Sequence, residues 1–166
     1  MAYSPTLSHV VLVITAGVLF YAALVDFKEF KIRNEVILIL IGLFVVHAFL
    51  SGRWLYAYWN LALAAVVLVV MLYFYAQGWM GGGDVKIMAV GFLWIGFDCA
   101  LVFAAFLLIF AIVQAVAAKL GWGRVHVIGD QKRIPFAPTV AGAMIVCFML
   151  GCLQPISLLT YLKHLQ

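Results

Sequence analysis

Apolar residues run along this chain in long stretches, and polar residues gather in the short segments between them. A helix that crosses a membrane needs about 20 apolar residues, because the hydrocarbon core is roughly 30 Å thick. The pattern therefore predicts an all-α integral membrane protein, a bundle of six transmembrane helices that forms a single domain over residues 1–166. The six predicted spans are Leu7–Val25, Val36–Leu50, Tyr56–Ala76, Val85–Phe97, Ala100–Ala118 and Phe136–Tyr161.

Three of these spans carry further information. No basic residue precedes the first span and no small-residue cleavage site follows it, so we expect a retained helix and not a signal peptide. The fourth span is short, and we expect it to be tilted or buried among its neighbours. The last span contains Pro155, which predicts a break near its end.

The composition supports a membrane protein and indicates its orientation. Hydrophobic residues make up 68% of the chain, charged residues only 10%, and the mean hydropathy is +1.20. A soluble domain is roughly half apolar and about a quarter charged, so a soluble globular protein is excluded. In a six-helix topology, all Lys and Arg residues except Arg53 and Lys163 fall on one side. This bias predicts that side to be cytoplasmic, in a bacterial inner membrane, with both termini outside.

The basic residues, the cysteines and the histidines do not indicate a further binding partner or a metal site. Topology and contact with an anionic lipid bilayer explain the basic balance, so no nucleic-acid partner is predicted. Cys99, Cys147 and Cys152 form no CxxC pair, and we expect them to be small apolar packing residues. The four histidines show no paired spacing that would complete a metal site. We therefore predict neither a metal site nor a cofactor.

The acidic residues point to a functional site. Asp26 directly ends the first span, and Asp84 directly begins the fourth. One helix runs inward to Asp26 and another runs outward from Asp84. The topology therefore predicts both acids at the cytoplasmic membrane edge, although 58 positions separate them. An ionisable group at membrane depth is expensive, which makes both acids functional candidates. Of the other four acids, we expect Asp98 in a solvated turn, Asp130 in a polar loop, and Glu29 and Glu35 at the lipid headgroups.

Three consecutive glycines, Gly81, Gly82 and Gly83, directly precede Asp84. Glycine adopts backbone angles that other residues avoid and leaves room for a neighbouring backbone, so we expect a sharp helix start with space for an extended substrate. The helix dipole would favour a negative charge at Asp84 and disfavour one at Asp26. Two acids with unequal proton affinities can activate water and protonate a leaving group. Each acid taken alone is also explained by a helix cap or a topology marker.

Two motifs resemble those of a known family. The segment "GGGD", Gly81–Asp84, resembles the GxGD signature of membrane-embedded aspartyl proteases, and Lys86 extends it to GxGDxK. The segment "DFKEFKIRN" resembles the first-aspartate motif of type IV prepilin peptidases, an Asp followed six residues later by Ile and eight residues later by Asn34. The segment "RIPFAP", which contains Pro135, is similar to the start of that family's last helix.

The resemblance implies a specific activity. Members of the family cut a short basic leader from pilin-like precursors at the cytoplasmic membrane surface, and they need no metal or cofactor. By motif, Asp26 and Asp84 would be the catalytic pair that activates water. Gly81 and Gly83 would shape the second half of the site together with Gly82. Lys86, Asn34 and Pro135 belong to matching motifs, but the resemblance assigns them no chemical role. The oligomeric state stays open.

The chain also departs from the family pattern. Longer prepilin peptidases carry a cytoplasmic domain with two CxxC pairs, which is tied to methylation of the new pilin terminus. This chain resembles the short, peptidase-only branch associated with tight-adherence pili, and also archaeal preflagellin peptidases. Methyl transfer is therefore not implied. Arg33 stands where the family often has proline.

Three other functions fit part of the pattern. A small transporter or channel-type protein could use Asp26 and Asp84 as a cation or proton site, although such sites usually lie near the membrane midplane. A scaffold of a pilus or secretion apparatus would not need two acids at one depth. A presenilin-type protease shares GxGD, but it typically has Tyr before a mid-helix aspartate, whereas Val25 precedes Asp26 here.

Overall fold

A computed structural model describes residues 5–29, 32–52, 54–120, 126–128, 131–133 and 135–152. These residues form six helices and one short antiparallel strand pair. The elements in chain order are α1 (Pro5–Glu29), α2 (Asn34–Ser51), α3 (Trp54–Ala76), α4 (Gly82–Ile95), α5 (Ala100–Lys119), β1 (His126–Ile128), β2 (Gln131–Arg133) and α6 (Ala137–Met149).

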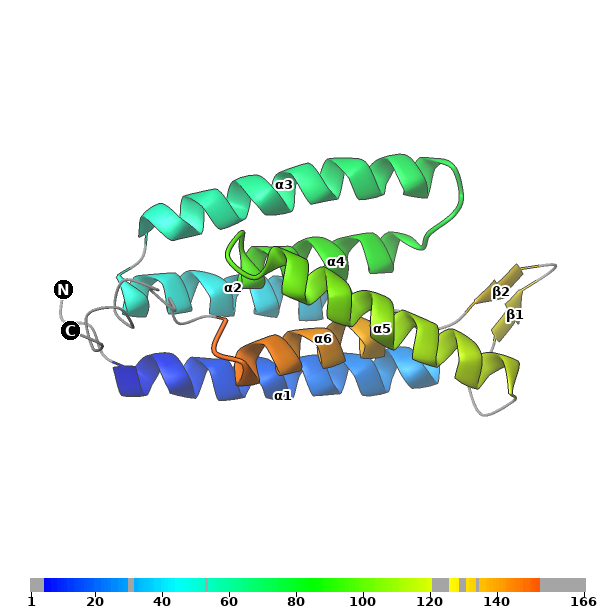
Figure 1. The fold of residues 1–166 in the computed structure, drawn as a ribbon, viewed down its shortest axis with the longest axis horizontal. Coiled ribbons are helices and arrows are strands. Elements are labelled where there is room, and N and C mark those ends of the chain that lie inside the picture. Colours follow the sequence, from blue (N-terminus) through cyan, green and yellow to red (C-terminus); the bar gives the residue numbers. More distant parts are fainter. Residues whose placement is uncertain are drawn as a thin grey trace, which may run out of the picture.

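The helices lie roughly along one common axis (Figure 1). Helix α4 is central, because it contacts α2, α3, α5 and α6. Helix α1 packs against α2 and α6 on one side of the bundle. The C-terminal end of α1 and the first turns of α2, α4 and α6 lie at the same end, near the strand pair (Figure 1). This arrangement brings the two predicted acids to one end of the molecule.

Four helices, α1, α2, α3 and α5, are long and apolar enough to cross a membrane. The helices α4 and α6 have 14 and 13 residues, which corresponds to lengths of only about 20 Å. The short fourth helix is buried among its neighbours, one of the two arrangements expected from its sequence. Helix α6 ends at Met149, well before the predicted Tyr161, and Gly151 follows with a φ of 75°. Residues from 153 onward, including Pro155, lie outside the described part of the chain.

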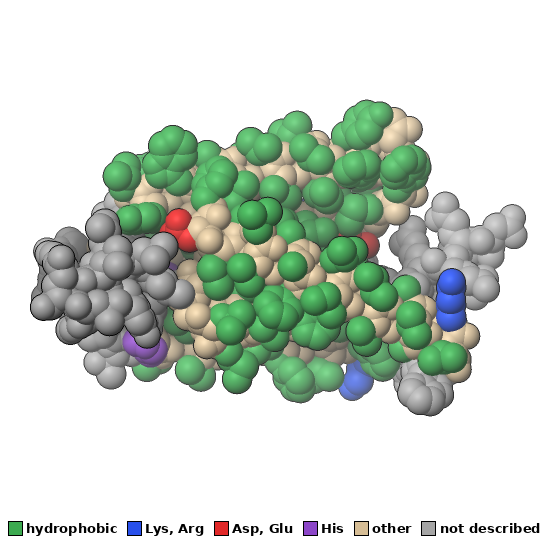
Figure 2. Space-filling view, viewed as in Figure 1, with side chains coloured by type: hydrophobic (Ala, Val, Ile, Leu, Met, Phe, Trp, Pro, Cys, Tyr) green, Lys and Arg blue, Asp and Glu red, His purple; other side chains and the backbone are tan. Residues whose placement is uncertain are grey.

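The surface of the bundle is strongly apolar. Only 6% of the most apolar window of α3 and 11% of that of α5 is buried inside the protein. Hydrophobic side chains cover nearly the whole visible length of the bundle, and charged side chains lie towards its two ends (Figure 2). A soluble protein rarely exposes an apolar surface of this extent, whereas lipid tails cover one without cost.

The core centres on Trp94 of α4, which is fully buried. Its indole Nε1–H donates a hydrogen bond to the carbonyl oxygen of Leu40 in α2 at 3.0 Å. One turn earlier in α4, the ring of Phe103 lies so close to Gly91 that an added Cβ would be 2.7 Å from its Cζ. Ring packing and one indole hydrogen bond therefore tie α4 to α2 and α5.

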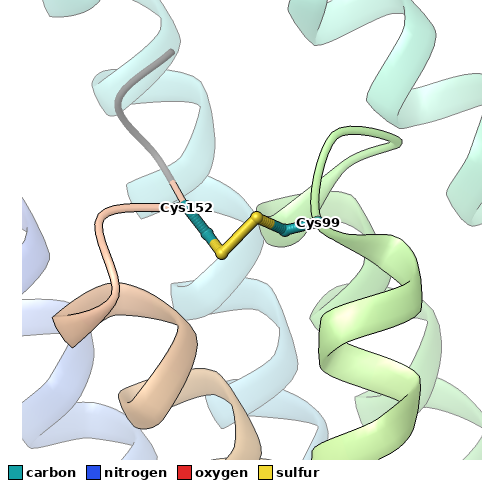
Figure 3. Close-up of a disulfide and its surroundings, with 2 residues drawn as sticks. All are labelled: Cys99 and Cys152. Carbon is teal, nitrogen blue, oxygen red and sulfur yellow. A yellow bond between two sulfur atoms is a disulfide. The ribbon is translucent and has the colours of Figure 1, made fainter. Parts of the chain in front are cut away.

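The expectation that all three cysteines are packing residues was wrong. Cys99, directly before α5, and Cys152, directly after α6, form a disulfide (Figure 3). Their Cα atoms are 5.8 Å apart, within the range that a disulfide spans. Cys147 is free and buried. The bridge lies at the bundle end opposite the first turns of α4 and α6.

A second feature that the sequence pattern did not predict is a strand pair between α5 and α6. The strands β1 and β2 pair antiparallel, with His126 opposite Arg133 and Ile128 opposite Gln131. They connect α5 to α6 at the end where α6 begins (Figure 1). The turn residues, including Asp130, lie outside the described residues.

Candidate active site

Asp26 lies in the last turn of α1 and is only 4% exposed. Its Oδ2 accepts a hydrogen bond from the backbone N–H of Ala137, the first residue of α6, at 2.8 Å. The residue before this helix, Phe136, supplies no side-chain cap. The carboxylate of one helix therefore caps the N-terminus of another, where exposed N–H groups and the helix dipole favour a negative charge.

This environment adds to one expectation. The sequence placed Asp26 near the C-terminus of its own helix, where the dipole disfavours a charge, and Asp26 does lie in the last turn of α1. The carboxylate also meets the N-terminal end of α6, whose dipole favours a charge. The position of α6 is a tertiary feature, so the sequence pattern of the first span could not reveal it.

Asp84 is the third residue of α4 and is partly buried. Its backbone N–H donates to the carbonyl oxygen of Gly81 at 3.1 Å. Its side chain folds back towards the same residue, since a Cβ added at Gly81 would lie 3.0 Å from Asp84 Oδ2. Asp84 thus lies at the N-terminus of α4, as Asp26 lies at the N-terminus of α6.

None of the three glycines needs an unusual backbone angle, and an added Cβ would be tight at Gly81 and Gly83 but not at Gly82. Gly81 has φ −76° and ψ 145°, an extended conformation open to any residue, and neither Gly82 nor Gly83 has a positive φ. The chain's own side chains fill the space that the glycines leave. The ring of Tyr75 lies 3.5 Å from a Cβ added at Gly82. The Cβ of Ile32 lies 3.2 Å from one added at Gly83.

The two aspartate motifs interlock through these contacts. Ile32, from the first motif, packs directly on Gly83 of the second. Two residues later, Asn34 Oδ1 accepts a hydrogen bond from Lys86 Nζ at 2.9 Å. The spacing of Ile and Asn after Asp26, and of Lys after Asp84, therefore has a physical reason. One apolar contact and one hydrogen bond fix the start of α2 against the start of α4.

Pro135 is buried and lies two residues before α6. Its carbonyl oxygen accepts a hydrogen bond from Gln114 Nε2 of α5, and Thr139 Oγ1 donates to Gln114 Oε1. The sequence analysis did not single out Gln114. A signal was present, because Gln114 and Lys119 are the only polar residues in the 20 residues of α5.

The profile of the type IV leader peptidase family matches residues 13–152, which include both acids, the three glycines and Pro135. This chain belongs to the type IV leader peptidase family. The prepilin peptidase resemblance is thereby confirmed, and family membership implies leader peptidase activity on prepilin-like precursors. It favours a peptidase over a transporter or a scaffold. No curated protein and no solved structure matches the chain significantly.

In this peptidase, the acids share one end of the bundle, and their helices do not pack backbone to backbone. No Cα atom of α1 lies within 8 Å of one of α4, so the backbones of Asp26 and Asp84 are farther apart than that. The helix ends that hold the carboxylates belong to α4 and α6, which do pack together. Within the described residues, no group of three His, Cys, Asp or Glu side chains is arranged to hold a metal ion.

Proposed function

We propose that this peptidase is an aspartic endopeptidase that uses Asp26 and Asp84 to remove the leader of prepilin-like precursors. One observation carries the proposal. Two carboxylates, 58 positions apart in the chain, lie at the N-termini of two contacting helices at one end of the bundle. Helix α2, which interlocks with α4 through Ile32 and Asn34, also packs against α1.

The chemistry that such a pair can perform is peptide hydrolysis by direct attack of water. The ionised carboxylate takes a proton from water while the water oxygen bonds to the scissile carbonyl carbon. The protonated carboxyl group gives its proton to the carbonyl oxygen. As the tetrahedral diol breaks down, the acid that took the water proton gives it to the departing amine, the C–N bond breaks, and the other carboxylate takes back a hydroxyl proton. Two coupled acids titrate as a unit, so we assign neither role to one residue.

We expect that binding of the precursor completes the site. Asp26 Oδ2 is engaged by Ala137, and the Asp84 side chain folds over Gly81. Catalytic contacts that are long in a substrate-free enzyme often tighten in the complex. With Asp26 held by α6, movement of the Asp84 side chain and of the start of α4 would bring both carboxylates to one scissile bond.

The same proposal includes an orientation in the bacterial inner membrane. Lys28, Arg33, Lys86 and Lys119 all belong to the helix ends beside the acids, which favours a cytoplasmic location for this end. The Cys99–Cys152 disulfide belongs to the opposite end, and disulfides persist in oxidising compartments such as the periplasm. In this topology α4 and α6 are the fourth and sixth membrane helices, and the termini are outside.

The precursor would be recognised in the plane of the membrane. Its apolar helix would lie against the bundle within the bilayer, while its basic leader stays on the cytoplasmic side near Asp26 and Asp84.

A leader-cleavage experiment tests the proposal. The chain is co-expressed with a candidate prepilin, in native form and as Asp26→Asn and Asp84→Asn, at equal membrane levels. Glu29→Gln and Asp98→Asn are matched controls, since they remove a carboxylate near the site and at the far end of the bundle. We expect the native chain and both controls to remove the leader, and neither Asp26→Asn nor Asp84→Asn to do so. Cleavage by either of these two variants would contradict the proposal.

A further inference from the structure

Gln114 is an unusual residue in its helix. The remainder of α5 is apolar up to Lys119, and its flanking residues Val113 and Ala115 are exposed on the lipid-facing surface. Gln114 itself is partly buried and faces α6. A side-chain amide in an apolar helix is costly unless both of its polar atoms find partners, so its contacts explain why it can be there.

Both polar atoms of Gln114 bond to the start of α6. Nε2 donates to the backbone carbonyl of Pro135, and Oε1 accepts from the hydroxyl of Thr139, which is only 3% exposed. Pro135 and Thr139 lie two residues before and two residues after Ala137. Gln114 therefore bridges the first turn of α6 across Ala137, the residue whose N–H donates to Asp26 Oδ2.

We propose that Gln114 is a positioning residue for Asp26, acting through the first turn of α6. This inference rests on the proposed catalytic role of Asp26. The side chain of Gln114 fixes the rotation and height of that turn from the α5 side, and Asp26 Oδ2 binds its N–H from the α1 side. Asp26 therefore meets the precursor from a helix end that is held in one place.

A hydrogen bond that only holds α5 against α6 would contribute to the stability of the fold and not to catalysis. A positioning bond contributes in addition to the geometry of Asp26, so its loss lowers kcat without weakening precursor binding. It also loosens one particular amide, that of Ala137. These two readouts separate the roles, because loss of stability alone changes the amount of folded enzyme and not the rate of each folded molecule.

The test compares Gln114→Met, which keeps the length and removes both hydrogen bonds, with Thr139→Val, which removes one. Ser51→Ala is the matched control, because it removes a side-chain bond to the Ala48 carbonyl at the other end of the bundle. Purified protein in lipid vesicles is assayed for kcat and KM on a prepilin, and hydrogen exchange is measured at Ala137. Rates are expressed per folded molecule.

We expect Gln114→Met to lower kcat on the order of 5- to 20-fold, with KM unchanged and faster exchange at Ala137. Thr139→Val should give a smaller effect in the same direction, and the double variant should be no worse than Gln114→Met. Ser51→Ala should match the native protein. The inference would be overturned if Gln114→Met left either kcat or hydrogen exchange at Ala137 unchanged. If Gln114→Met does not fold, the same two measurements on Thr139→Val decide. An inactive native chain, or cleavage by Asp26→Asn, would instead overturn the proposed function. Hydrogen exchange at Ala137 distinguishes failure of the proposed function from failure of this inference, because it is measured without the cleavage reaction.

Discussion

Gly81 is the position where one methyl group should disturb the Asp84 carboxylate most selectively. An alanine Cβ there would lie 3.0 Å from Asp84 Oδ2 and 3.6 Å from its Cγ. Unstrained contacts of this kind lie near 3.5 Å, so the carboxylate must move by roughly 0.5 Å. The backbone at Gly81 is extended and open to alanine, so the effect falls on the side chain of Asp84.

The expected size follows from this displacement. A catalytic group misplaced by 1 Å costs about 100-fold in rate, so a shift of half that distance should lower kcat about 10-fold. Gly82→Ala is the matched control, because its Cβ would meet Tyr75 at an ordinary 3.5 Å. Alanine also favours a helix over glycine by up to about 1 kcal/mol, so this control should be as stable as the native chain or more stable.

Gly83→Ala gives a third, different result. Its Cβ would lie 3.2 Å from Cβ of Ile32, an atom bound directly to the backbone that cannot turn aside. We expect a loss of about 1–3 kcal/mol in the free energy of unfolding. Thermal unfolding and kcat on a prepilin, measured side by side, distinguish the three variants.

Two results would refute this reasoning. Native activity in Gly81→Ala would mean that the observed position of the Asp84 carboxylate is not the one that matters for catalysis. An equal loss of activity in Gly82→Ala would mean that the glycines serve something other than the space occupied by Asp84, Tyr75 and Ile32.

Three further predictions follow from the packing. Cys99→Ser should lower the free energy of unfolding by about 2–4 kcal/mol, because the disulfide joins residues 53 positions apart. Cleavage by the folded protein should stay unchanged. Thermal unfolding combined with a cleavage assay checks this prediction, and a loss of cleavage would contradict it. Asn34→Ala and Lys86→Met should each lower the free energy of unfolding by about 0.5–1 kcal/mol, and the double variant should lose no more than either single variant. Additive losses would exclude the 2.9 Å hydrogen bond between Asn34 and Lys86 as the cause. Gly91→Ala should lower the free energy of unfolding by about 1–3 kcal/mol, because the new Cβ clashes with the Phe103 ring. Adding Phe103→Leu to the same chain should restore part of this loss. If unfolding measurements show no rescue, the clash is not the cause.

The main features of the fold and the location of the acids could be predicted from the sequence. Long apolar runs specify helices directly, since a bilayer leaves the backbone few alternatives, and all six predicted helix starts lie within about three residues of those observed. The alternation of direction between successive helices then brings the end of α1 and the start of α4 to the same end of the bundle.

The contacts that build the site could not be predicted in this way. Ile32 against Gly83, and Asp26 against Ala137, depend on how helices distant in sequence pack together. The disulfide was missed for the same reason, since spacing says nothing about two cysteines at separate helix ends. The strand pair was foreseeable, because two residues, Gly129 and Asp130, separate its strands, a spacing typical of a tight hairpin.

The central claim is that Asp26 and Asp84, 58 positions apart in the chain, act together on one peptide bond. The most direct test is the cleavage rate of purified Asp26→Asn, Asp84→Asn and the double variant in lipid vesicles, at equal folded amounts. Residues that act as a unit are not additive, so we predict that each single variant falls to the background rate and that the double variant is no slower. Substantial cleavage by either single variant, or losses that multiply in the double variant, would contradict the claim.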